Sequence, residues 1–356
     1  MIPAYVFAPL AFAACALTLP LAKRAAMYWH IYDHPGNLKI HREPIPRVGG
    51  IAMMAGLCAC LVPATLAFPS GYGLCLLAIA AVWVVGLADD VVNLSPRIRL
   101  GIHLAAGVLL WIAGGRLHWT TNRMLDLLLT SIFVAFLINA MNLFDGMDGL
   151  AAGTTTIAAF GFLWLPLDPY SKIVVWSLIG VCLGMLLANF PPASMFMGDS
   201  GSTLIGILLA FLTLDWIRIQ PDTNNLLSPL VFISLPVADT LLAIVRRLRS
   251  RRSPFCGDRR HFYDLLLQRG WSVRSVLVAS VGMTGVLVLM GGLSYGEQRI
   301  SHVMAILTVG FLSFVAHVLG SLRPNVIEGP VQRQIFSLRV QSRTDVPENR
   351  ALLNRG

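Results

Sequence analysis

Residues 72–91 read YGLCLLAIAAVWVVGLADDV, an apolar run that ends in two adjacent aspartates before a single valine. A helix that crosses a bilayer needs roughly 20 mostly apolar residues, so this run is long enough to span a membrane. Further runs of this kind lie at 3–22, 48–67, 99–115, 125–142, 150–167, 172–189, 202–218, 227–245, 274–292 and 300–320. The sequence therefore predicts an all-α, polytopic integral membrane protein with about eleven transmembrane helices.

The composition of the whole chain supports this interpretation. Of its 356 residues, 56% are hydrophobic and 13% are charged, and the mean hydropathy is +0.70. Soluble domains carry about 25% charged residues, so the composition argues against a soluble fold and against a disordered chain. We expect a single transmembrane domain over residues 1–320, followed by a polar cytoplasmic tail over 321–356.

The basic residues are divided unevenly between the two sides of the predicted membrane. The net charge is +9, but the basic residues lie in short loops between apolar runs, so they indicate membrane orientation and no nucleic-acid partner. With the N-terminus outside, 22 of the 27 Lys and Arg fall on the inner side and five on the outer side. Because cytoplasmic loops are enriched in Lys and Arg, we expect an outer N-terminus and a cytoplasmic C-terminus.

Acidic residues gather where three of the predicted spans meet the cytoplasm. The five residues concerned are Asp89, Asp90, Asp145, Asp148 and Asp199. A single aspartate at a membrane boundary can be merely solvated or can cap the next helix, but five on one side favour a functional site. Adjacent positions on a helix point about 100° apart, so Asp89 and Asp90 should have different roles.

The ligand types available at this boundary indicate which ion and which groups could bind there. Several hard oxygen ligands without a His or Cys cluster favour Mg²⁺, with Mn²⁺ as an alternative, over zinc. The basic loop 246–261 adds arginines, which suit phosphate oxygens, although orientation alone explains most of them. His261 is the single histidine of this loop, and we expect it to contact substrate.

Six collinear motifs carry a resemblance to a known family. They are HREPIPRVGG (41–50), the Asp89–Asp90 pair, NLFDGMDGLAAG (142–153), NFPPASMFMGDSGS (189–202), PVADT (236–240) and RRSPFCGDRRH (251–261). Together they resemble the polyprenyl-phosphate N-acetylhexosamine-1-phosphate transferases of glycosyltransferase family 4, which are similar to undecaprenyl-phosphate N-acetylglucosaminyl-1-phosphate transferase. Any one of these motifs alone would be a weak signal.

The resemblance implies a reaction and a place for it. A UDP-N-acetylhexosamine gives its sugar-1-phosphate to undecaprenyl phosphate, UMP leaves, and the lipid product starts a cell-surface glycan such as O-antigen. The enzyme is an Mg²⁺-dependent phosphotransferase of the bacterial inner (cytoplasmic) membrane, with its active site on the cytoplasmic face. Residues 1–320 would then form the catalytic domain, and a homodimer is compatible with the family.

The resemblance also implies roles for individual residues. Asp199 matches a magnesium ligand, Asp90 is expected at the metal site and in catalysis beside the pyrophosphate, and Asp89 is the candidate catalytic acceptor of the lipid-phosphate proton. Phe196 matches an aromatic residue that stacks on uracil. The other residues expected at the site are Asn142, Asp145, Asp148, Asn189, Arg42 and Arg259 for substrate binding and His261 for catalysis.

One motif departs from the family pattern. Many relatives continue the Asp-Arg loop as His-x-His-His, whereas this chain has Tyr263 and Asp264 in the last two positions. We therefore carry over no role from the missing histidines, and we expect the choice of sugar to differ.

Other functions fit the sequence less well. An intramembrane prenyltransferase would need a third aspartate in DDxxD spacing, and a CDP-alcohol phosphotransferase would need an arginine after Asp148–Gly149; both features are missing. A membrane transporter remains the alternative, for which only Asp239 is clearly inside a predicted span.

Overall fold

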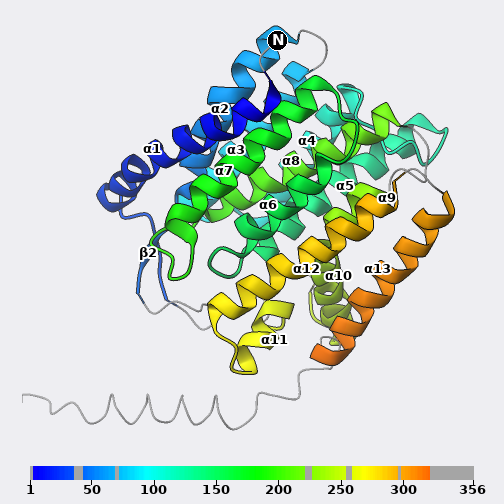
Figure 1. The fold of residues 1–356 in the computed structure, drawn as a ribbon. Helices are drawn as coiled ribbons and strands as arrows, with labels where there is room; N and C mark the ends of the chain where they lie inside the picture. The colour runs from blue at the N-terminus through cyan, green and yellow to red at the C-terminus, as the bar shows by residue number, and fades with distance from the viewer. Residues whose placement is uncertain are drawn as a thin grey trace, which may run out of the picture.

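The computed structural model describes residues 3–35, 43–68, 72–220, 227–253, 259–295 and 298–320. The chain is almost entirely helical there, apart from one short antiparallel hairpin (Figure 1). In chain order the elements are η1 (Ala4–Val6), α1 (Phe7–Tyr28), β1 (Tyr32–Asp33), β2 (Ile45–Pro46), α2 (Gly49–Ala67), α3 (Tyr72–Val92), α4 (Pro96–Ile112), α5 (Arg123–Phe144), α6 (Leu150–Phe162), α7 (Pro169–Asn189), α8 (Gly198–Ile219), α9 (Leu227–Phe232), α10 (Ser234–Arg249), α11 (Phe262–Gln268), α12 (Val273–Leu293) and α13 (Gln298–Leu319).

Seven of the described helical segments are long and apolar enough to cross a membrane. They comprise η1 with α1, and α2, α3, α5, α7, α8 and α12. The prediction of an all-α membrane protein is therefore confirmed. The remaining predicted spans coincide with α4, α6, α9–α10 and α13, so the count of eleven crossings stays a prediction, as does the orientation.

Two of the predicted spans differ from the helices that are observed. The span over 227–245 is broken at Ile233, which separates α9 from α10. Pro236 explains the break, because proline has no backbone N–H to donate to the carbonyl of Phe232 four residues earlier. The span over 150–167 is shorter than expected, since α6 ends at Phe162.

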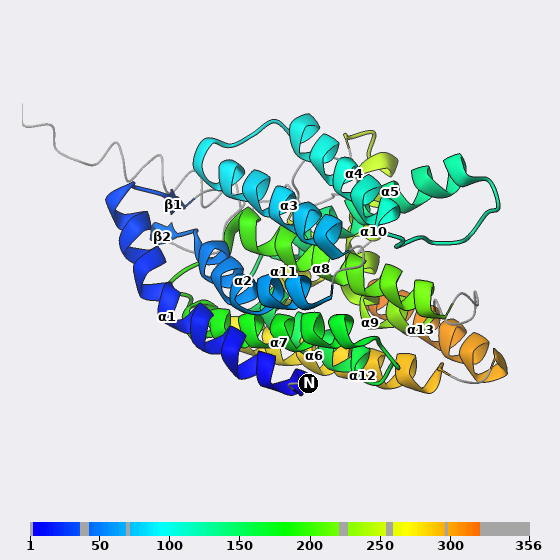
Figure 2. The same cartoon turned by 90° about the horizontal axis from the view of Figure 1, so that it is seen from above.

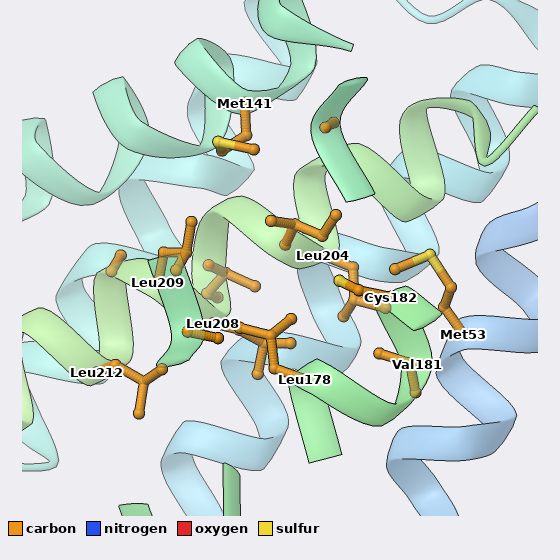
Figure 3. Packing of buried hydrophobic residues seen from close by; sticks show 14 of the residues in the cluster. Met53, Met141, Leu178, Val181, Cys182, Leu204, Leu208, Leu209 and Leu212 are labelled. Atoms are coloured by element: carbon orange, nitrogen blue, oxygen red, sulfur yellow. The ribbon is translucent and has the colours of Figure 1, made fainter. Parts of the chain in front are cut away.

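Helix α8 forms the axis of the bundle. Its residues from Ser200 to Ile217 are all buried, which is the pattern of a helix surrounded by protein and not by lipid. It packs against α2, α3 and α5, while α1 packs on α2 and α7 at the outside. Figure 3 shows Leu204 and Leu208 of α8 meeting Leu178 and Cys182 of α7 in this core.

Close approach between α8 and its neighbours depends on small residues. A Cβ placed on Gly86 of α3 would lie 2.7 Å from the Ser200 Cα, and one on Gly206 would lie 2.6 Å from the Ile138 Cα of α5. Helices in membranes associate largely through such close packing, because lipid gives them no hydrophobic drive to associate. These contacts fix the start of α8 against α3 and α5.

The connections that carry the sequence motifs share one end of the bundle. At this end α3, α5 and α7 finish, while α4, α6 and α8 begin. The β1–β2 hairpin and α11 lie at the same end, and the N-terminus lies at the opposite end (Figures 1 and 2). The chain thus brings together the loops that the sequence assigns to one side of the membrane.

A partly buried ion-pair network ties the starts of α3 and α7 to the end of α8. Arg218 at the end of α8 donates to Asp168 at 3.0 Å and to Asp215 through its Nε at 2.8 Å. Tyr72 also donates to Asp168 at 2.9 Å and accepts from Arg218 at 3.0 Å. Ser171 donates to Asp215. One guanidinium thereby serves two carboxylates from different helices.

We expect Arg218→Met to lower stability without removing the chemistry at the other end. The change leaves Asp168 and Asp215 without their cation, and breaking a buried pair from one side costs about 3–5 kcal/mol. Because the Arg218 side chain is 39% exposed, the cost should lie at or below the lower limit. The thermal midpoint in detergent should fall by roughly 5 °C, while the specific activity of the folded fraction stays at the wild-type level. An unchanged midpoint would show that the network is not a structural clamp.

Candidate active site

Arg99 joins two of the predicted site aspartates. Its Nη1 atom donates to Asp89 Oδ2 at 2.6 Å and to Asp199 Oδ2 at 2.8 Å. Asp89 comes from the end of α3, Arg99 from the first turn of α4 and Asp199 from the first turn of α8. Two carboxylates from distant parts of the chain therefore face the same cationic nitrogen.

The Asp90 carboxylate binds the start of α8 and not Arg99. Its Oδ1 accepts the backbone N–H of Asp199 at 2.8 Å, and its Oδ2 accepts the N–H of Ser200 at 3.0 Å and the Ser200 hydroxyl at 2.6 Å. Gly198 has a φ of +72°, and a Cβ there would lie 2.5 Å from Asp90 Oδ2. The Asp90 carboxylate thus caps the helix that carries Asp199, where the helix dipole favours negative charge.

Arg47 connects the hairpin to the end of α3. Its Nη2 atom donates to the backbone carbonyls of Asp89 at 3.1 Å and Asp90 at 3.2 Å, and its Nε lies 3.6 Å from Asp90 Oδ1. Arg47 satisfies carbonyls that the end of a helix leaves without partners.

The loop between α7 and α8 is tied to β2 by its backbone. Phe196 donates its N–H to the Pro46 carbonyl at 2.8 Å and accepts from the Gly49 N–H at 3.0 Å. The Phe196 side chain is half-buried. The loop that holds this aromatic ring is therefore fixed beside the start of α8.

The turn between α5 and α6 adds a fourth carboxylate. Asp145 follows the last residue of α5, and burial raises the pKa of Asp145 well above its usual range. The neighbouring carboxylates of Asp199 and Asp90 raise the pKa of Asp145 further, since like charges disfavour ionisation. Negative charge is thus concentrated where α3, α5 and α8 meet.

Three other predicted residues hold the surrounding loops. Asp148 accepts the Ala193 N–H at 2.9 Å. Asn189 accepts the Gly149 N–H at 2.9 Å and donates to the Met195 carbonyl at 3.2 Å. Asn142 donates to the Ser202 hydroxyl of α8 at 3.0 Å. Asp148 and Asn189 link the α5–α6 turn to the end of α7 and the loop that follows it, and Asn142 links α5 to α8 directly.

His261 lies beside this region, paired with an aspartate from α10. Its Nδ1 is 2.6 Å from Asp239 Oδ2, while Asp239 Oδ1 accepts the Phe262 N–H at 2.8 Å. Both side chains are buried. A carboxylate held against one ring nitrogen orients the imidazole and selects its tautomer. Asp239 therefore lies at the same end of the bundle as the other aspartates.

The two residues that depart from the family pattern are also buried here. Tyr263 stacks on the His261 ring at 5.6 Å between centroids, and its hydroxyl packs against Gly146 in the α5–α6 turn. Asp264 pairs with Arg259 at 3.0 Å. Burial raises the pKa of Asp264 to about 6, and Arg259 opposes that rise. The departures are built into the packing around Asp145.

The donor set fits a magnesium ion that is held partly by substrate. Among the described residues, no three His, Cys, Asp or Glu side chains form a complete metal cage. Magnesium commonly takes one or two protein carboxylates and fills its shell with water and phosphate oxygens. Asp199 and Asp89 already face one cationic nitrogen, and burial together with the neighbouring carboxylates raises the pKa of Asp145. A divalent cation would relieve that repulsion.

The structure brings together most of the residues that the sequence predicts, and it adds others. Arg42 lies outside the described residues. Neither Arg99 nor Arg47 was assigned to the site from the sequence. Arg99 was used only to predict the membrane orientation, and Arg47 was quoted only as part of the motif 41–50. Arg99 could have been found from its place in the first turn of the helix that follows the Asp89–Asp90 pair.

Comparisons with known proteins agree with the motifs. The family model described as "Glycosyl transferase family 4" matches residues 72–217. The chain is 30% identical over 305 residues to an Escherichia coli (strain K12) protein named undecaprenyl-phosphate alpha-N-acetylglucosaminyl 1-phosphate transferase, covering 78% of this chain and 80% of that relative.

Two further relatives carry names of the same kind. A Bacillus subtilis (strain 168) protein named probable undecaprenyl-phosphate N-acetylglucosaminyl 1-phosphate transferase is 28% identical over 317 residues, or 85% of this chain and 88% of the relative. A Mycolicibacterium smegmatis protein named decaprenyl-phosphate N-acetylglucosaminephosphotransferase is 32% identical over 297 residues, or 71% of this chain and 73% of the relative. The chain, a multi-pass membrane protein, therefore belongs to glycosyl transferase family 4, the polyprenyl-phosphate N-acetylhexosamine-1-phosphate transferases.

Proposed function

We propose that this protein transfers an N-acetylhexosamine-1-phosphate from a UDP-sugar to undecaprenyl phosphate and releases UMP, as the first step of a cell-surface glycan such as O-antigen. The observation that carries the proposal is the arginine bridge between Asp89 and Asp199 at one end of an apolar bundle. A site at a membrane boundary can receive a lipid phosphate from the bilayer and a nucleotide from the water. The names of the relatives support the same reaction class.

Asp199 and Asp89 have different proposed roles in bringing the two phosphates together. Asp199 is the proposed Mg²⁺ ligand, and the ion, when bound, would neutralise charge on the pyrophosphate that is broken. Asp89 accepts the proton of the lipid phosphate, whose oxygen attacks the sugar-bearing phosphorus. Arg99 stands between them and offers further positive charge to the same phosphates. Phosphoryl transfer needs positioning and neutralisation of charge more than covalent help.

Asp90 acts beside the metal by holding α8. Both of its oxygens already accept hydrogen bonds from Asp199 and Ser200, so binding an ion directly would require it to release the cap. We therefore assign Asp90 the role of positioning Asp199, because the Asp90 carboxylate accepts the backbone N–H of Asp199. This retains the expected place of Asp90 next to the metal and changes what its carboxylate does there.

The nucleotide is proposed to lie between the α7–α8 loop and the α5–α6 turn. Phe196 presents the aromatic ring for uracil, and Asp145, Asp148, Asn142 and Asn189 build the surrounding walls. His261 and Arg259 face the sugar and phosphate side, where Tyr263 and Asp264 reshape the pocket. Arg42 is proposed to bind substrate on the strength of the motif alone.

We expect Phe196→Ala to weaken donor binding more than acceptor binding. Stacking of a base on an aromatic ring is worth about 1–3 kcal/mol, so the donor KM should rise roughly 5- to 100-fold. Phe196→Tyr retains the ring and should restore most of the affinity. Initial rates measured against each substrate in turn would check this, and a change confined to the acceptor KM would reverse the assignment.

A donor screen tests the proposed reaction. Purified protein, undecaprenyl phosphate and a panel of radiolabelled UDP-sugars should yield a chloroform-soluble labelled lipid with one N-acetylhexosamine donor, only when Mg²⁺ or Mn²⁺ is present. No labelled lipid with any donor would contradict the proposal. Asp239, the acid that the transporter alternative singled out, binds His261 at the site end of the bundle.

A further inference from the structure

The loop between α4 and α5 forms a pocket at the end of the bundle away from the carboxylates. Arg99 lies in the first turn of α4, and the pocket begins beyond its last turn, about 20 Å further along the helix. The cavity has a volume of about 670 Å³, and its lining includes Arg116, His118, Trp119, Arg123 and Asp126. In Figure 2 this loop projects at the edge of the molecule, clear of the other helices.

Two arginines of this pocket converge on one aromatic ring. The guanidinium carbon of Arg116 lies 4.3 Å from the centroid of Trp111, and that of Arg123 lies 5.7 Å from it. Neither arginine has a carboxylate partner among the described residues, and the Arg116 Nε is buried without a hydrogen bond. Arg218, at the same end of the bundle, has two carboxylate partners. Two guanidinium groups that lie beside one ring without a carboxylate partner among the described residues favour the binding of an anion.

The carboxylate of the pocket does not supply that charge. Asp126 is 4% exposed and accepts the Trp111 Nε1–H at 2.9 Å, which fixes the ring on which the arginines stack. Its second oxygen is buried and has no partner in the described structure. The pocket therefore has two guanidinium groups against one carboxylate, a net charge that matches a monoanion.

The surroundings place the pocket at the depth of lipid headgroups. Trp119 is 52% exposed, and Met124 and Leu128 on the first turns of α5 are 70% and 54% exposed. Tryptophan gathers at membrane–water interfaces, and exposed apolar side chains of a spanning helix face lipid tails. Basic pockets between membrane helices are known to bind anionic headgroups on the cytoplasmic side, and the same attraction between arginine and phosphate applies in this pocket.

We propose that this pocket binds one anionic phospholipid of the leaflet opposite the active site. Arg116 and Arg123, both within reach of the Trp111 ring, hold the phosphodiester, and the lipid tails lie along the exposed face of α5. Phosphatidylglycerol, with one negative charge on its phosphodiester, fits the net charge of the pocket. Binding here is independent of the transferase reaction at the other end.

Native mass spectrometry of the full chain in detergent tests the proposal. Phosphatidylglycerol and phosphatidylcholine are titrated separately against the wild type, the double variant Arg116→Gln with Arg123→Gln, and Lys172→Gln. Lys172 is the matched control, because it is an exposed basic residue at the same end of the bundle but outside the pocket. The thermal midpoint of each variant confirms that it is folded.

The wild type should bind its first phosphatidylglycerol roughly 30-fold more tightly than the double variant does, since each arginine near an anionic headgroup is worth about a fivefold change. Phosphatidylcholine should bind both proteins alike, and Lys172→Gln should match the wild type. A fourth protein, Arg116→Lys with Arg123→Lys, retains the charge without the planar forks and should lose part of the preference. Equal binding of both lipids by the wild type, or equal losses in the Lys172 variant, would overturn the proposal.

Discussion

Asp199→Asn should reduce transfer at least a hundredfold while leaving the protein expressed and folded. The asparagine remains close in shape and can still accept from Arg99, but it removes a negative charge from the proposed metal ligand. Loss of one of few metal carboxylates removes several kcal/mol of charge stabilisation in the transition state. Rates of lipid labelling across a magnesium titration, together with the thermal midpoint, measure the two parts of this expectation.

Glu43→Gln provides the control for that variant. Glu43 is an exposed carboxylate close to β2, at the hairpin end of the bundle and outside the cluster of aspartates. Its replacement should leave the magnesium profile unchanged. Turnover of the Asp199 variant at the wild-type rate in low magnesium would remove Asp199 from the metal site.

Substitutions of the neighbouring residues Asp89 and Asp90 are expected to change the pH and magnesium dependence of the transfer rate in different ways. Asp89→Asn should lower the rate by about a hundredfold or more at low pH, as removal of a general base does, and should recover partly as the pH rises. A phosphate monoester loses its second proton near pH 6, so the acceptor needs less help above that value. The measurement is the rate of transfer between pH 6 and 9 at saturating magnesium.

Asp90→Asn should behave differently, because its carboxylate holds the start of α8. An asparagine retains one acceptor oxygen of the two, so the first turn of α8 loosens and Asp199 moves from its position. The variant should require more magnesium, show no recovery with pH and melt at a lower temperature. Asp90→Ala, with no acceptor, should be worse on every measure. Identical pH and magnesium profiles for Asp89→Asn and Asp90→Asn would contradict this division.

The positions of most helices could be predicted because membrane spans are set by local composition. Most of the long apolar runs form helices within a few residues of their predicted bounds. The break at Ile233 could not be read from composition, because the run through Pro236 is apolar on both sides and only the missing hydrogen-bond donor interrupts it.

The sequence was enough to predict which residues form the candidate site, but it was not enough to predict which of them contact one another. Acids are scarce in this apolar chain, and that scarcity is enough to single out Asp89, Asp90 and Asp199 from the sequence. Which carboxylate meets Arg99 and which one caps α8 depends on how α3 rotates against α8, and that rotation is set by the packing of Gly86 on Ser200. No pattern local to either segment carries this information.

The cap between Asp90 and α8 joins segments separated by 109 residues, so it cannot form until late in synthesis. At a synthesis rate of about 5–20 residues per second, α3 waits on the order of 5–20 s for α8 to emerge. During that interval Asp90 has none of its three α8 donors, so water must solvate its carboxylate at the bilayer edge. Chains that stop before Gly198 never form the cap, and they are expected to hold the end of α3 less firmly than the complete chain does.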